Sequence, residues 1–223
     1  MRRCIFFSFF ILLCFCSNTL IGETRKSPIS HIRFHYLNNN NGLAQNTVDC
    51  ILQDSRGFIW FGTWNGLCRY DGYTFTTYNK TKDLSGIPDN FIQSMSEDSK
   101  GNIWIGTKNG LSRFLFNENR FSLPENIKSN LNGHSIPHIS IDKQKKIWIA
   151  TDDDGVWLIE EEKENSYSVK KITEIVLPNK HISHILIHKE NILIGTENGL
   201  VIVDKINFQN DTTLNKLIKS VAN

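Results

Sequence analysis

Short runs of alternating apolar and polar residues follow one another along the chain after residue 47, and turn residues separate them. Such runs, bounded by Gly, Asn or Asp, are typical of β-strands joined by tight turns. Four runs make a unit, and the unit recurs about every 44 residues. The pattern therefore predicts an all-β protein built from repeated four-stranded units.

The clearest part of the unit is a 14-residue segment that begins at Asp54, and its copies begin at Asp98, Asp142 and Glu190. Its anchor positions are 44, 44 and 45 residues apart: Trp60, Trp104, Trp148 and Leu193. A β-rich unit with a period of roughly 40–45 residues is the signature of propeller blades. We predict a partial β-propeller of about four blades, at 47–79, 91–123, 135–173 and 182–209.

Each blade is expected to have four strands, A to D, from the innermost to the outermost. Asp-x-x-Gly after strand A predicts a type I turn. Asn-Gly or Asp-Gly after strand B predicts a tight hairpin that needs positive φ. The tryptophan of strand B is expected to fill the wedge between blades. The structural anchors of the repeat are therefore Trp60, Trp104, Trp148, Gly62, Gly106, Gly195, Gly66, Gly110, Gly155 and Gly199.

The unit Asp-x-x-Gly-x-Ile-Trp-Ile-Gly-Thr-x-Asn-Gly-Leu resembles the two-component regulator propeller repeat. The opening from Phe34 to Leu43 and the segment 70–75 also resemble the start of such sensors, so the resemblance covers about residues 32–205. It implies the N-terminal periplasmic sensor part of a bacterial hybrid two-component histidine kinase, associated with polysaccharide breakdown products. Propellers of this family usually have about seven blades, with a β-sandwich, a membrane helix and a kinase after them. We therefore expect a truncated sensor that forms an open arc.

The two ends of the chain carry separate predictions. Residues 1–22 have the cationic start, apolar run and polar end of a secretory signal peptide, with an uncleaved N-terminal anchor as the alternative. Residues 32–37 match an outer strand, which would close a missing last blade. Residues 210–223 are interpreted as a truncated connection to the next blade. The protein is expected to be exported to the periplasm, where it could be anchored to the inner membrane through the N-terminal segment alone.

The net charge and the possible metal-ligating residues reduce the number of possible functions. The chain has 25 basic and 23 acidic residues, and Arg2 and Arg3 account for the excess. A neutral body does not favour nucleic acid, because phosphate binding needs clustered cations. The histidines at 181, 184 and 188 lie in an expected strand, where they cannot share a face as metal ligands would. Asp152–Asp154 lacks the spacing of a calcium loop. We expect no metal, no cofactor and no catalytic residue.

A ligand surface is the remaining candidate. In propellers, the B–C turns and the D-to-A connections share one face, and residues that vary within a repeated frame are where function is usually placed. The candidate ligand-binding residues are Trp64, Asn65, Lys108, Asp153 and Glu197. Trp64 is the aromatic residue among them and could stack on a sugar, so an oligosaccharide is the expected ligand. The alternatives are a propeller scaffold for protein partners and a glycan-active enzyme; other expected partners are the remaining blades and downstream sensor domains.

Overall fold

The computed structural model describes residues 34–81, 86–173, 175, 177–189, 191–204 and 219–221. The chain divides into two units, Met1–Tyr36 and Leu37–Asn223, and all of its strands lie in the second. The expected signal segment at 1–22 lies outside the described residues. Within the described part, no helix is long and apolar enough to cross a membrane.

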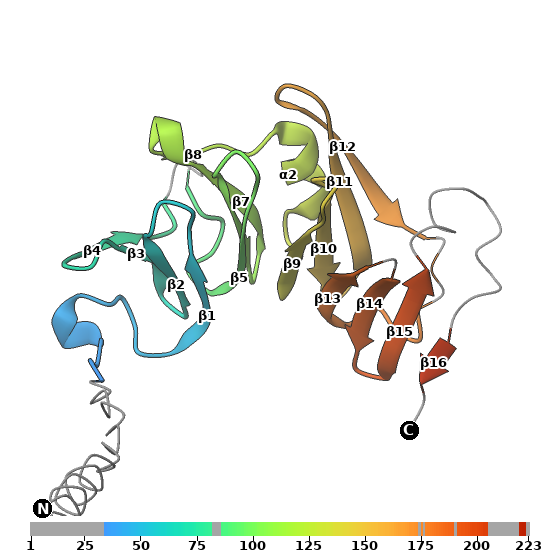
Figure 1. Cartoon of the computed structure of the whole chain (residues 1–223), viewed down its shortest axis with the longest axis horizontal. Coiled ribbons are helices and arrows are strands. Elements are labelled where there is room, and N and C mark those ends of the chain that lie inside the picture. The colour runs from blue at the N-terminus through green and yellow to red at the C-terminus, as the bar shows by residue number, and fades with distance from the viewer. Residues whose placement is uncertain are drawn as a thin grey trace, which may run out of the picture. The chain divides into compact units, whose positions relative to one another are not determined.

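In the described part of the chain, sixteen strands form four antiparallel sheets in which the spatial order follows the chain order (Figure 1). The first two sheets contain β1 (Val48–Gln53), β2 (Ile59–Thr63), β3 (Gly66–Tyr70), β4 (Phe75–Tyr78), β5 (Ile92–Glu97), β6 (Ile103–Thr107), β7 (Gly110–Leu115) and β8 (Arg120–Phe121). The last two contain β9 (His138–Ile141), β10 (Ile147–Thr151), β11 (Gly155–Lys163), β12 (Ser166–Ile172), β13 (Ile182–His188), β14 (Asn191–Thr196), β15 (Gly199–Asp204) and β16 (Lys219–Val221).

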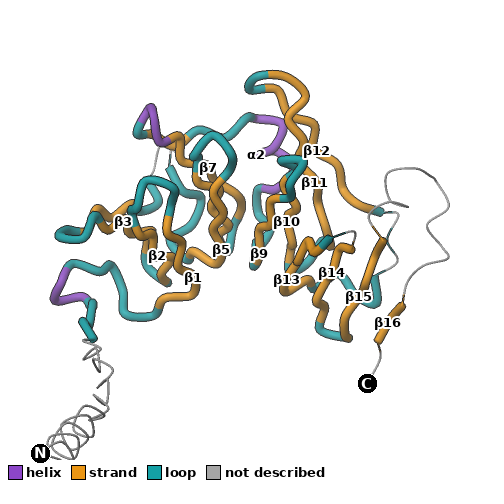
Figure 2. The backbone as a smooth tube through the Cα atoms, viewed as in Figure 1, coloured by secondary structure: helices purple, strands orange, loops and turns teal. Residues whose placement is uncertain are grey.

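The four sheets are blades of a propeller arc. The innermost strand of each sheet contacts that of the next, in the order β1, β5, β9 and β13. The tube in Figure 2 shows the repeated meander, in which short loops join almost every pair of strands. The first and fourth sheets do not close into a ring, and each leaves an apolar side chain of its inner strand exposed: Ile51 on β1 and Leu186 on β13. The predicted all-β partial propeller of four blades is confirmed.

Two features differ from the expected layout, and a third expectation lies outside the described residues. Phe34–Leu37 form no strand, and no ladder pairs with them in the described structure, so the outer strand expected at 32–37 has no counterpart there. Residues 205–218, which include the expected last outer strand near residue 206, lie outside the described part. Residues 219–221, placed in a connecting segment by the sequence, instead form β16 and pair with β15.

Short helices interrupt the strand pattern at three places: η1 (Asn39–Asn41), η2 (Phe116–Glu118) and α2 (Glu125–Leu131). The strand-based prediction missed α2, although its signals are local. Pro124 precedes its first residue, and Ile127 and Leu131 lie four residues apart, on one face of the helix. Both are fully buried, so packing against the blades stabilises a helix that is too short to be stable alone.

The turn between the two innermost strands is tied to the tryptophan of the next strand. In the first blade, Asp54 Oδ1 accepts hydrogen bonds from the backbone N–H groups of Arg56 and Phe58, both at 3.0 Å. Its other oxygen, Oδ2, accepts the indole N–H of Trp60 at 2.8 Å. One carboxylate thus closes the turn and orients the ring, and Asp98 and Asp142 do the same for Trp104 and Trp148. The sequence predicted the turn role of this aspartate but not its bond to the ring.

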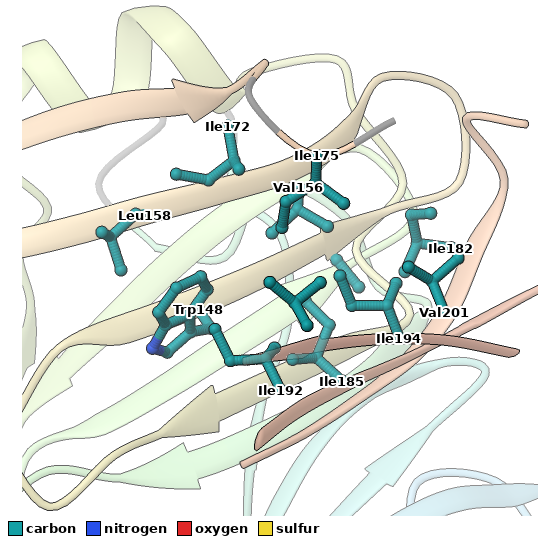
Figure 3. Packing of buried hydrophobic residues seen from close by; sticks show 12 residues of the cluster. Trp148, Val156, Leu158, Ile172, Ile175, Ile182, Ile185, Ile192, Ile194 and Val201 are labelled. Atoms are coloured by element: carbon teal, nitrogen blue, oxygen red, sulfur yellow. The ribbon is translucent and has the colours of Figure 1, made fainter. Parts of the chain in front are cut away.

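The three tryptophans lie between neighbouring blades. Trp60 packs on Phe114 of the second blade, with 5.3 Å between ring centroids, and Trp104 meets the edge of Tyr167 of the third blade at 6.1 Å. Trp148 lies in a cluster with Ile185 and Ile192 of the fourth blade (Figure 3). All three rings are at most 1% exposed.

Two glycines of the repeat are needed because strand A lies across them. A Cβ at Gly62 would overlap the Cys50 sulfur of β1. A Cβ at Gly106 would overlap Ser94 Oγ and would lie 2.6 Å from the carbonyl oxygen of Ile136 in the next blade. The Gly-Thr step of the repeat therefore permits close approach between strands and between blades.

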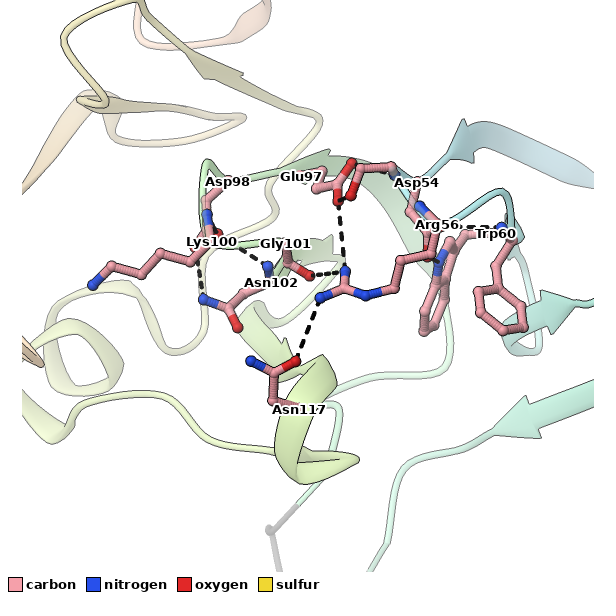
Figure 4. A network of polar contacts seen from close by, with 11 residues as sticks. Asp54, Arg56, Trp60, Glu97, Asp98, Lys100, Gly101, Asn102 and Asn117 are labelled. Atoms are coloured by element: carbon pink, nitrogen blue, oxygen red, sulfur yellow. Dashed lines mark hydrogen bonds and ion pairs between the residues drawn. The ribbon is translucent and has the colours of Figure 1, made fainter.

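Polar contacts add to the packing between the first two blades (Figure 4). Arg56 donates to the carbonyl oxygen of Gly101 at 3.2 Å and lies 3.8 Å from the Glu97 carboxylate. The Ser55 backbone N–H donates to the same carboxylate at 2.8 Å. The Arg56 guanidinium also stacks over the Phe116 ring at 3.9 Å. Because these side chains are partly exposed, we expect the network to fix the register of the two blades more than it stabilises them.

Replacing Trp104 with alanine tests the wedge. Trp104→Ala should lower the free energy of unfolding by about 3–5 kcal/mol, the usual cost of deleting a large buried aromatic side chain. Chemical denaturation followed by circular dichroism measures this. Trp64→Ala, which removes a ring that is 53% exposed, is the matched control and should cost less than about 1 kcal/mol. An unchanged midpoint in Trp104→Ala would contradict the structural role.

The turn glycine at 110 has φ of +130°, a conformation that a β-branched residue does not adopt without strain. Gly110→Val should therefore destabilise the protein more than Lys108→Val, two residues earlier in the same hairpin. Thermal denaturation of the two variants side by side measures the difference. Equal losses would show that the positive φ at Gly110 does not limit stability.

Candidate functional site

The B–C turns and the segments that precede each strand A lie together. The Trp64 N–H donates to the Thr47 carbonyl oxygen at 3.3 Å. The Lys108 N–H donates to Phe91 O, and the Asp152 N–H to Ser135 O, both at 3.0 Å. These bonds repeat at equivalent positions in three blades. We call this face the turn surface, and it comprises the turns at 64–65, 108–109, 152–154 and 197–198 with the segments before β1, β5, β9 and β13.

Trp64 is exposed but held in place. Its indole N–H donates to Asp49 Oδ1 at 2.9 Å, and its ring lies 5.2 Å from that of Phe91 at an interplanar angle of 51°. About half of the side chain remains open to solvent, at 53%. A fixed, exposed aromatic face costs little entropy to bind against, which is what a stacking platform requires.

Lys108 approaches the same phenylalanine, and both residues belong to the second blade. Its ammonium nitrogen lies 5.6 Å from the Phe91 ring centroid, within cation–π range. Asn65 accepts a hydrogen bond from the Asn90 side chain at 3.4 Å, in the connection that leads to Phe91. The structure therefore brings Trp64, Asn65 and Lys108 to one area, centred on a residue that the sequence analysis did not single out.

Asp153 and Glu197 belong to a different part of the surface. The Asp153 carboxylate lies 2.9 Å from His134 Nδ1, so it pairs with the segment before β9. Asp152 lies 3.3 Å from His181 Nδ1. The hydrogen bond to Asp152, together with the negative charge of Glu197, raises the pKa of His181. This half of the turn surface is acidic and histidine-rich, whereas the half around Trp64 is aromatic and cationic.

Phe91 could have been identified from the sequence, because it differs in type from the equivalent residues of the other blades. Its carbonyl oxygen accepts the same turn N–H as those of Thr47 and Ser135, so the three residues are equivalent. Two of the three are small and polar, and only the second is a large ring. Comparing the segments before strand A, as well as the turns, would have identified it.

The inner strands of the third and fourth blades bring two histidines together. The rings of His138 and His184 lie 5.0 Å apart, and His138 Nδ1 accepts the backbone N–H of Ile185 at 3.3 Å. Burial, and then the neighbouring His184, lower the pKa of His138. No group of three or more metal-ligating side chains occurs among the described residues. His138 Nδ1 accepts the Ile185 N–H and therefore carries no proton, and the contact between the two rings is one of packing.

This pair makes stability depend on pH. Because the folded-state pKa of His138 is lowered, the unfolded chain binds a proton first as the pH falls below about 6.5, the ordinary histidine pKa. The contribution of His138 to stability should therefore fall between about pH 7 and pH 5, and His138→Gln should remove that part of the pH dependence. Denaturation midpoints across this range measure it. His188→Gln, at an exposed position on β13, is the control and should leave the slope unchanged; equal slopes in all three proteins would contradict the assignment.

Comparison with known proteins agrees with this arrangement. The family model "two component regulator propeller" matches residues 42–65 and 86–109, which confirms the repeat predicted from the sequence. The chain thus contains two-component regulator propeller repeats, in segments that run from before strand A into the B–C turn. No curated protein sequence matches the chain.

Solved structures share the fold. An extracellular domain assigned to a hybrid two-component system of B. thetaiotaomicron matches with a TM-score of 0.69 at 24% identity, over 84% of this chain and 26% of that one. An extracellular domain assigned to a one-component system of the same organism matches with a TM-score of 0.60 at 24% identity, over 75% and 22%. Virginiamycin B lyase from Staphylococcus aureus matches with a TM-score of 0.52 at 17% identity, over 71% and 53%. The chain spans about a quarter of the length of the first two.

Proposed function

We propose that this chain is the ligand-sensing propeller segment of a bacterial two-component sensor and that it recognises a glycan fragment on the turn surface. The observation that carries the proposal is the fixed and exposed ring of Trp64, placed within regulator-propeller repeats. The repeats support a sensor, and the ring supports the kind of ligand.

The chemistry around Trp64 suits a sugar. An aromatic face packs against the C–H groups of a pyranose ring, while neighbouring amides and carboxylates bind its hydroxyl groups. Asn65 lies next to Trp64 in the chain, and Asp49 is bonded to the indole. The Lys108 ammonium group, held over Phe91, adds a donor from the second blade. A ligand at this point would touch two blades and would therefore sense their relative position.

The proposed location is the periplasm. The signal-like residues 1–22 support export, and the similar solved structures are described as extracellular domains. Signal transmission would then depend on segments beyond those described here. A protein scaffold on the same surface is the alternative. Catalysis is a further alternative, since one propeller of similar fold is a lyase.

Trp64→Ala tests the ligand surface. Binding of defined oligosaccharides, such as xylohexaose, cellohexaose and hexagalacturonate, is measured by isothermal titration calorimetry. For any that binds, Trp64→Ala should weaken the affinity by about tenfold, because one stacked aromatic contact typically contributes on the order of 1 kcal/mol or more. Tyr73→Ala is the matched control, because Tyr73 is 91% exposed in the same blade but lies in the turn between β3 and β4.

The outcomes separate the candidate functions. Binding that Trp64→Ala weakens by about tenfold and Tyr73→Ala leaves intact supports the sensor surface. Equal losses in the two variants, or none, would contradict a role for Trp64. Release of shorter sugars during incubation with the oligosaccharides would instead establish an enzyme. Absence of binding to a broad glycan panel, together with capture of a defined protein partner, would favour the scaffold.

A further inference from the structure

The outer strand of the second blade is shorter than its counterparts. β8 pairs with β7 only at Phe114 and Leu115. In the other three blades, the outer strand reaches the residue that follows the turn glycine, in the pairs Leu67–Tyr78, Val156–Ile172 and Leu200–Val221. The equivalent residue of the second blade is Leu111, and within the described sheet no outer strand reaches it.

The chain leaves the sheet at this point and forms α2, as Figure 1 shows. The Ser122 N–H donates to Arg113 O at 2.9 Å, and the chain then turns away. The helix is held on the third blade, since the Asn126 side chain donates to the Tyr167 carbonyl oxygen at 2.6 Å. The space beside Leu111 and Ser112 that a fourth strand would occupy is therefore left as a cavity.

The cavity has a volume of about 400 Å³. The wall combines three kinds of group, which come from the connection between β4 and β5, the β6–β7 turn, β7, β8 with the segment after it, and α2 with its C-cap. Two ammonium groups belong to Lys80 and Lys128, and amide and hydroxyl groups to Asn109, Asn132, Ser112 and Ser122. The apolar part consists of Pro88, Leu111, Phe121 and Leu123.

The charged residues among the described residues of this wall are all positive. The described residues that line the cavity include two lysines and no carboxylate. Within the described structure, neither Lys80 nor Lys128 takes part in an ion pair. Lys128 is half-buried in the last turn of α2, whereas Lys80 is exposed, and both residues line the cavity. Two cations without a counter-charge favour an anionic occupant.

We propose that this cavity is a binding site for a small organic oxyanion, a molecule of about monosaccharide size that bears a carboxylate or a sulfate ester. The two ammonium groups would bind the oxyanion, and the asparagines and serines its hydroxyl groups. Leu111, Phe121 and Leu123 would contact its C–H face. The volume lies in the range of about 300–1,000 Å³ that is typical of small-ligand sites. Of the four turns in the turn surface, only the turn at 108–109 contributes to the cavity, through Asn109, and Trp64 does not line it, so the two sites can be tested separately.

Four probes test the proposal with the full chain by isothermal titration calorimetry: D-glucuronate, glucose 6-sulfate, D-glucose and sodium sulfate. At least one of the two acidic sugars should bind, and which one binds distinguishes carboxylate from sulfate. Neutral glucose, of the same size and shape, should bind at least about tenfold more weakly, because a charge-assisted hydrogen bond is roughly twice as strong as a neutral one. Sodium sulfate alone should also bind more weakly, because it leaves the amides and the apolar wall unused.

Matched lysine variants locate the site. Lys80→Gln and Lys128→Gln should each weaken the binding of the acidic sugar by about tenfold, as expected for loss of a charged partner. Lys163→Gln, in the β11–β12 hairpin of the third blade, should change it by less than about twofold. The Trp64→Ala variant should bind the acidic sugar like the unmodified protein, which separates this site from the proposed glycan surface.

A measurement without substitutions covers the case in which a variant does not fold. Bound acidic sugar should protect Lys80 and Lys128 from acetylation by acetic anhydride, read out by mass spectrometry, and leave Lys163 reactive. Each of the following results would overturn the proposal: no binding of either acidic sugar at 10 mM, about the highest concentration useful for weak sites; equal binding of glucose; sulfate binding as tight as that of the sugars; or protection of Lys163 as strong as that of Lys128.

Discussion

The hydrogen bond that a buried indole N–H donates to an aspartate is the interaction on which this structure depends. In the first three blades, one carboxylate oxygen closes the turn after strand A, and the other orients the tryptophan of strand B. A buried indole N–H without a partner would cost roughly 1–3 kcal/mol, so this bond allows a very large side chain to be buried completely. The orientation of the ring then determines the position of the next blade, because the ring forms the surface on which that blade packs.

Each tryptophan surface packs on the blade that follows it in the chain. Trp60, Trp104 and Trp148 each meet the following blade, whereas the corresponding Leu193 of the fourth blade is only half-buried. The fourth blade also lacks the aspartate turn and makes a shorter connection through Lys189, which has a positive φ of 52°. The third blade is intermediate. It keeps Asp142 but places Lys145, at φ of 66°, where the first two have glycine, and so accepts some backbone strain. From the first blade to the fourth, the repeat sequence thus departs further from its motif, and the structure of the turn after strand A changes with it.

The fold could be predicted from the sequence because each rule that determines it is local and repeated. Turn chemistry at Asp54 and Gly66, the period of the tryptophans and the strand alternation all agree, and agreement between levels identifies a fold. What the sequence did not predict depends on contacts between blades. The helix α2, the contact of the Phe91 ring with Trp64 and the pairing of His138 with His184 all arise where segments of neighbouring blades meet. The candidate residues were predicted as one set because they share a turn, but the structure divides them between an aromatic half and an acidic half.

The departures from the repeat are where function is expected, and two of them lie in the second blade. The backbone N–H and C=O groups of a propeller blade are hydrogen-bonded within its four-stranded sheet. A blade that gives up part of its outer strand therefore loses hydrogen bonds and packing. Such a loss persists only if other contacts offset it, and here Ile127, Leu131 and the Asn126 bond to Tyr167 anchor α2 instead. These contacts restore the core but leave the edge of Leu111 facing a cavity lined by two cations. The same blade contributes Lys108 and Phe91 to the turn surface. The second blade therefore contributes to both proposed sites: a ligand at the turn surface would act where this blade meets the first, and a ligand in the cavity would act beside α2, which packs on the third.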